Sequence, residues 1–70
     1  MKETYYVVQD KNSEAFYCVL PNRGFVVWST ELFKAFLFST EAEAEKVRLG
    51  RYPPEVSLTV LRVSMVVESL

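Results

Sequence analysis

The most restrictive feature of this chain is a set of three predicted strands that are apolar on both faces, with one short predicted helix to cover them. The strands span residues 4–9, 15–20 and 25–28, and each is rich in valine, tyrosine, phenylalanine or tryptophan, which are typical of sheets. One helix covers one face of a sheet. The other face must meet water, curl into a core of its own, or bind a partner.

Size limits how this fold can be stabilised. The chain has 70 residues and forms one α+β domain, residues 1–70. At this length folding buries only about 60% of the unfolded surface, so disulfides, metals or oligomerisation often help. Cys18 is the single cysteine and histidine is absent, which leaves no intramolecular disulfide and too few ligands for a zinc site. We expect no metal and no other cofactor, and oligomerisation remains.

The charge balance argues against strong electrostatic recognition. Eight basic and nine acidic side chains leave a net charge of −1, which attracts nucleic acids or anionic lipids only weakly over long range. No apolar run reaches the roughly 20 residues that span a bilayer. The chain also starts without the apolar segment of a signal peptide. We therefore expect a protein that does not enter a membrane. We also expect it to be cytoplasmic, because a free thiol stays reduced in the cytoplasm.

The second half of the chain carries one helix signal and one long strand. Thr40 and Glu43 have the spacing of a capping box, and Gly50 is typical of a helix end, so a helix of about ten residues is predicted between them. Residues 36–38 are interpreted as a short edge strand. Residues 56–67 form a long strand whose apolar pattern changes phase between Val60 and Leu61, which predicts a β-bulge there.

These elements follow the order β-β-β-(β)-α-β. Polar turns at residues 10–14 and 21–24, the second with Gly24 to supply a positive φ, separate the first three strands, which predicts an antiparallel meander. The fold class is therefore α+β, with three to four meander strands, one short α-helix and one long C-terminal strand. We expect Gln9 to lie opposite Ala15, and Leu20 to lie opposite Phe25.

Both registers sort the side chains onto two faces. The face assigned to the helix holds residues that need no polar partner, namely Tyr6, Val8, Phe16, Cys18, Leu20, Phe25 and Val27. The other face holds Tyr5, Val7, Tyr17, Val19, Val26 and Trp28. Tyrosine and tryptophan combine an apolar body with a polar tip, and such residues dominate binding hot spots.

We interpret Tyr5, Tyr17 and Trp28 as anchors of a protein-binding surface, with Arg23 and Arg51 as rim charges. Three states of this face stay open. It can form a second small core within the chain, the interface of a homodimer, or a surface for a different protein. An alternative function is nucleic-acid binding through the same aromatic residues and a basic cluster. That cluster consists of Arg23, Lys34, Lys46, Arg48 and Arg51.

The sequence does not indicate catalysis. Glu41, Glu43 and Glu45 lie where acidic side chains stabilise the start of a helix, and alternate helix positions point in different directions. Cys18 lies in the middle of a predicted strand, and the chain has no histidine to activate it. We therefore expect a protein without enzymatic activity.

One sequence pattern resembles that of small bacteriophage and mobile-element accessory proteins. It begins with the Tyr-Tyr-Val-Val strand at residues 5–8 and a strand that contains Trp28. The segment Ala-Phe-Leu-Phe-Ser-Thr at residues 35–40 then leads into a glutamate-rich helix and a final strand. The resemblance implies a non-catalytic protein that binds and inhibits a host defence complex, as anti-CRISPR proteins do.

Overall fold

The computed structural model describes residues 2–20, 24–50, 57–66 and 68. It contains an antiparallel sheet and one α-helix, which confirms the α+β fold class. The strands are β1 (Lys2–Asp10), β2 (Phe16–Val19), β3 (Val26–Ser29) and β4 (Leu58–Val66). A short 3-10 helix, η1 (Leu32–Lys34), and the α-helix α1 (Glu41–Arg48) lie between β3 and β4 in the sequence.

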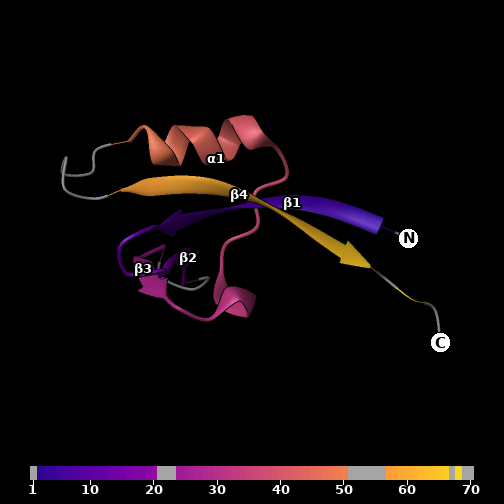
Figure 1. Cartoon of the computed structure of the whole chain (residues 1–70), viewed down its shortest axis with the longest axis horizontal. Helices are drawn as coiled ribbons and strands as arrows, with labels where there is room; N and C mark the ends of the chain where they lie inside the picture. The colour runs from indigo at the N-terminus through magenta and orange to yellow at the C-terminus, as the bar shows by residue number, and fades with distance from the viewer. Residues whose placement is uncertain (1, 21–23, 51–56, 67, 69–70) are drawn as a thin grey trace.

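The sheet has the strand order β3-β2-β1-β4, so the first three strands form the predicted meander and the last strand joins beside β1. The two helical segments lie on opposite sides of the sheet (Figure 1). We call the side that carries α1 the helix side, and the side that carries η1 the groove side. The far end of the β1–β4 pair extends beyond both helices (Figure 1).

The helix begins where the sequence predicts. The Thr40 hydroxyl accepts a hydrogen bond from the backbone N–H of Glu43 at 3.3 Å and donates one to its carboxylate at 3.2 Å. At the other end, the Gly50 N–H donates to the carbonyl of Val47 at 3.0 Å. Ala44 is fully buried, and Val47 packs against the same cluster. The cap and this apolar pair together orient α1 over β1 and β4.

The predicted register between the first two strands is wrong by one residue. Gln9 lies opposite Phe16, not Ala15, because β1 continues through Asp10, whose N–H donates to the Ala15 carbonyl at 2.8 Å. The Asp10 carboxylate accepts hydrogen bonds from Asn12 and Ser13, which close a turn one residue shorter than expected. A one-residue shift exchanges the two faces of a strand.

The predicted β-bulge in the last strand is also wrong. The β1–β4 ladder runs without interruption from Lys2 opposite Val66 to Asp10 opposite Leu58. Val60 therefore faces the helix side with Val8, whereas Leu61 and Val63 face the groove side with Val7. The apolar pattern changes phase because the covered side of β4 changes along the strand. The helix α1 packs on the helix side of only part of β4.

Residues 36–38 do not form the predicted edge strand. Phe38 exchanges two backbone hydrogen bonds with Tyr6, at 2.8 and 2.9 Å, and the Phe36 N–H donates to the Tyr17 carbonyl at 3.0 Å. This segment thus lies between β2 and β1, where the two strands separate. It carries the chain from η1 to α1 (Figure 1), with Ala35 buried on the groove side and Phe38 on the helix side.

The protein consequently has a small core on each side of the sheet. On the groove side, Val7, Phe16, Cys18 and Ala35 form one cluster. On the helix side, Val8, Phe38 and Ala44 form the other, with Tyr6, Tyr17, Val47, Leu58 and Val60 packed against it. Among the described residues, Val7 and Val8 are the largest side chains that are fully buried. Neighbours in β1 thus anchor both cores.

Replacing either central valine should destabilise the protein to a similar extent. Val7→Ala and Val8→Ala each remove two buried methyl groups and leave a cavity, which costs about 2 kcal/mol. Val66→Ala is the control, because Val66 is 70% exposed and such changes cost under about 0.5 kcal/mol. Urea unfolding measures all three. A fall of about 2 kcal/mol in the free energy of unfolding of only one buried variant would contradict the two-core arrangement.

Removal of the helix cap gives a second stability prediction. Thr40→Ala leaves the Glu43 N–H without its side-chain acceptor, so the free energy of unfolding should fall by about 1 kcal/mol. Thr30→Ala provides a matched control, because Thr30 is exposed and lies before η1. Urea midpoints, with helicity followed by circular dichroism, compare the two variants. Equal midpoints would show that the cap does not hold the helix.

Candidate protein-binding surfaces

A large share of the apolar side chains remains exposed. Thirteen large hydrophobic residues among those described keep more than a third of their surface in contact with solvent. In β3 every apolar residue is exposed, including Trp28 at 38%, and the adjoining Phe25 is 61% exposed. Isolated exposed apolar residues are normal, but clusters of this size mark interaction surfaces.

On the helix side, a row of aromatic rings runs from buried Phe38, which shares a cluster with Ala44 of α1, to the exposed side chains of Trp28 and Phe36. Tyr17 packs edge-on against Trp28 and beside Phe38, with ring centroids 5.9 Å apart in both pairs. Phe36 extends the row, 4.7 Å from Phe38. The predicted β2–β3 register is correct here, because Tyr17 lies opposite Trp28 and the Leu20 N–H bonds to the Phe25 carbonyl. We call Tyr17, Trp28, Phe36 and Phe38 the aromatic row.

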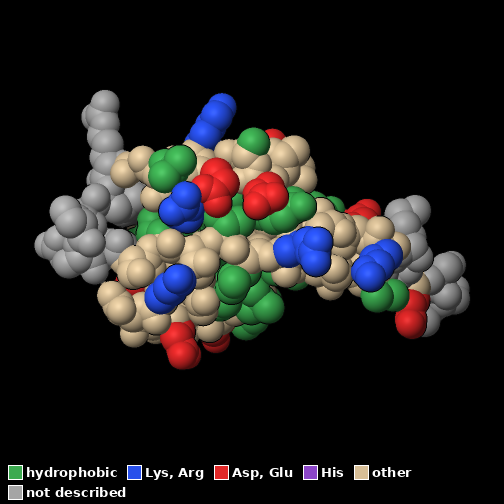
Figure 2. Space-filling view, turned by 45° about the horizontal axis from the view of Figure 1, so that its top comes forward, with side chains coloured by type: hydrophobic (Ala, Val, Ile, Leu, Met, Phe, Trp, Pro, Cys, Tyr) green, Lys and Arg blue, Asp and Glu red, His purple; other side chains and the backbone are tan. Residues whose placement is uncertain are grey.

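Charged groups on the helix side are mixed in sign. Basic and acidic side chains are interspersed across it, and hydrophobic side chains show between α1 and the sheet (Figure 2). Arg48 pairs with Glu45 at 2.7 Å, and this carboxylate raises the pKa of Arg48. On η1, the Glu31 carboxylate pairs with Lys34 at 2.8 Å and raises the pKa of Lys34. Two members of the predicted basic cluster therefore already have acidic partners.

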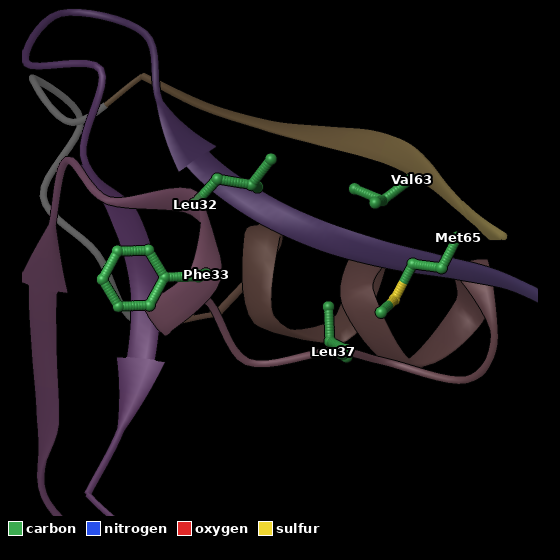
Figure 3. A pocket seen from close by; sticks show the side chains of 5 residues that line it. All are labelled: Leu32, Phe33, Leu37, Val63 and Met65. Carbon is green, nitrogen blue, oxygen red and sulfur yellow. The ribbon is translucent and has the colours of Figure 1, made fainter. Parts of the chain in front are cut away.

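The groove side carries an apolar hollow of about 480 Å³. Leu32 and Phe33 of η1 line one end, Val63 and Met65 of β4 line the other, and Leu37 lies between them (Figure 3). Phe33 is 81% exposed, and the Lys34 ammonium lies 5.8 Å from its ring centroid. We call these five lining residues the apolar groove.

The structure does not place the three predicted aromatic anchors on one face, which corrects that prediction. Tyr17 and Trp28 lie on the helix side, whereas Tyr5 lies on the groove side opposite Val63. The Tyr5 hydroxyl donates to the Glu3 carboxylate at 2.7 Å. That hydrogen bond raises the pKa of Tyr5, because the carboxylate stabilises the protonated phenol. The error follows from the shifted β1–β2 register.

Other predicted positions have different outcomes. Arg23 and Arg51, the proposed rim charges, lie outside the described residues. Gly24 has the positive φ that the turn prediction required, at 66°. Within residues 2–20, 24–50, 57–66 and 68, no group of three potential metal-ligating side chains comes together. No helix in this part of the chain has the length and apolar character needed to cross a membrane.

Cys18 belongs to the core and not to an exposed site. Its side chain is 97% buried, as its 3% exposure shows, and the thiol donates a weak hydrogen bond to the Phe16 carbonyl at 3.3 Å. Burial raises the pKa of the thiol, while a Ser29 backbone group and the charge of Lys34 oppose that shift. Cys18 was assigned to the helix side, but it packs with Val7 on the groove side.

The apolar groove was not predicted from the sequence. Its residues come from η1, from Leu37 and from β4, and the segment from 32 to 38 has neither the period of a helix nor that of a strand. The available signal was the density of large apolar residues in that segment, since Leu32, Phe33, Phe36 and Leu37 are all large and apolar.

Comparison of the chain with protein-family models, with curated proteins and with solved structures finds no match.

The buried thiol gives a prediction about pH. Because the pKa of the Cys18 thiol is higher in the folded state, the thiol of the unfolded chain loses its proton at a lower pH. The thiol's contribution to the free energy of unfolding is therefore present at neutral pH and lost as pH rises past about 9. The stability difference between the protein and its Cys18→Ala variant should therefore shrink between pH 8 and pH 10.5. Urea unfolding of both proteins across this range measures it. A constant difference would contradict the pKa shift.

Proposed function

We propose that this protein acts without catalysis, by binding another protein through β3 and the aromatic row. The observation that carries the proposal is the exposed edge of the sheet. Among the described residues, β3 pairs only with β2, so its second edge has no strand partner. Residues 25–28 are all apolar and exposed. Natural sheets usually protect such an edge with charges, prolines or bulges.

An edge of this kind suits the addition of a strand from a partner. Backbone hydrogen bonds supply affinity, and side chains on alternate positions supply specificity. On β3 the helix-side positions are Val26 and Trp28, and Trp28 is the member of the aromatic row that lies on this edge strand. The opposite edge, β4, carries the exposed cation Arg62 near its middle, and a charge there opposes strand addition. The partner segment is therefore expected to be extended and apolar.

The class of partner rests on the sequence resemblance. The pattern shared with small phage and mobile-element proteins supports a phage-encoded inhibitor that binds a host defence complex. The mixed charge of the helix side and the existing ion pairs of Lys34 and Arg48 support protein binding more than binding to nucleic acid.

A proline substitution tests the edge without disturbing the ladder to β2. Antiparallel strands alternate between hydrogen-bonded and non-bonded pairs, and the Leu20–Phe25 bond places the next residue, Val26, with its N–H directed away from β2. Val26→Pro removes that outward donor, which edge strands tolerate. Val26→Thr keeps the donor and the branched side chain, so it is the matched control.

The expected result is selective loss of the partner. Immobilised protein and the Val26→Thr variant should retain the same bacterial proteins from a lysate, and Val26→Pro should retain at most about a tenth of them because the outward hydrogen bond and its neighbours are lost. Circular dichroism and the urea midpoint establish that Val26→Pro is folded. Equal retention by a folded Val26→Pro variant would rule out strand addition at β3.

A further inference from the structure

The groove side places a projecting ring beside a hollow that can accept one. Phe33 is the most exposed of the large hydrophobic side chains among the described residues, at 81%. It stands at one end of the apolar groove, whose volume of about 480 Å³ exceeds that of a single aromatic side chain (Figure 3). Both features are apolar, so both are stabilised by removal from water.

Charged side chains lie at both ends of the groove, the Lys34–Glu31 ion pair at one end and Glu3 at the other. Lys34 directly follows the projecting Phe33 and is exposed. At the far end, Glu3 lies opposite Met65 in the β1–β4 ladder, on the same side of the sheet. The Tyr5 hydroxyl holds the Glu3 carboxylate at 2.7 Å. The projection therefore has the Lys34–Glu31 ion pair beside it, and the hollow has the Glu3 carboxylate beside it.

Most of the exposed large apolar side chains belong to this side of the sheet. Eight of the thirteen exposed large hydrophobic residues belong to the groove side, as judged from strand register and groove lining: Leu20, Phe25, Val27, Leu32, Phe33, Leu37, Leu61 and Met65. Their exposed fractions amount to about four complete side chains, or roughly 700 Å² at somewhat under 200 Å² each.

We propose that a second copy of this chain covers the groove side, in a dimer with two-fold symmetry. Phe33 of each protomer enters the apolar groove of the other, and Lys34 approaches Glu3 of the partner subunit. A two-fold interface joins the same surface of both protomers. Because this surface carries both the projecting Phe33 and the apolar groove, the contact between them forms twice in the dimer. Burial of all eight exposed apolar side chains on this side would approach the roughly 800 Å² per partner of a stable interface.

Charge supports a second copy as the occupant. Exchange of the two protomers brings Lys34 of each copy to the end of the other groove that carries Glu3, and the Lys34 ammonium has three donors, enough for Glu31 and the partner's Glu3. The net charge of −1 adds little repulsion between copies. This dimer leaves the helix-side positions of β3, Val26 and Trp28, uncovered, whereas Phe25 and Val27 lie on the covered side.

Sedimentation equilibrium between about 1 and 500 µM tests the dimer. The protein should dimerise with a Kd in the micromolar range, as expected for an interface of this size. Phe33→Glu should weaken association at least about 100-fold, because it places a charge in an apolar hollow, whereas Phe33→Leu should remain a dimer. Leu49→Glu is the control, since Leu49 is 70% exposed at the end of α1.

A charge exchange tests the orientation of the two copies. Glu3→Lys and Lys34→Glu should each weaken association about tenfold, because each puts like charges together across the interface. The combined variant should recover to within about threefold of the original Kd. Circular dichroism confirms that each variant is folded.

Three results would overturn the proposal. These are a protein that stays monomeric up to about 500 µM, equal dissociation by Leu49→Glu and Phe33→Glu, or no recovery in the combined charge variant. None of them bears on the retention experiment with Val26→Pro, because Val26 faces the helix side.

Discussion

Two neighbouring residues of β1, Val7 and Val8, are fully buried although they point to opposite sides of the sheet. Burial on both sides at one point of a strand requires a cover on each side. The helix α1 supplies one through Ala44, and Ala35, which directly follows η1, contributes to the other. The segment that joins these two covers must therefore pass from one side of the sheet to the other, which explains why it lies between β1 and β2. Much of the remaining architecture follows from this requirement.

Because both covers lie over β1, few side chains remain to cover the rest of the sheet. The apolar residues of β3 remain exposed on both sides, and the far half of the β1–β4 pair extends past α1. The uncovered surface is thereby divided into two parts with different character. The helix side presents rings arranged around Tyr17 next to an open strand edge. The groove side presents a hollow with Phe33 projecting beside it. Separate surfaces can serve separate contacts.

Local sequence signals predicted local structure well. The Thr40 cap, the positive φ of Gly24 and the opposition of Tyr17 and Trp28 each depend on a few adjacent residues or one tight turn. Predictions were less successful where the sequence allowed two strand registers equally well. The turn after β1 could close with or without Asp10 in the strand, and the Asp10 carboxylate decided this by bonding to Asn12 and Ser13. The resulting one-residue shift moved Tyr17 to the helix side and separated it from Tyr5.

The sequence by itself determined the three meander strands, the α-helix and the long last strand, together with their order, the fold class and the excess of apolar surface over available cover. These depend on residue type, short-range spacing and composition, which are fully present in the chain. Only the tertiary structure decided which side each strand residue faces and where the uncovered surface lies. The phase change between Val60 and Leu61 illustrates the reason. A bulge and a change of cover produce the same apolar pattern, and what packs above and below the strand distinguishes them.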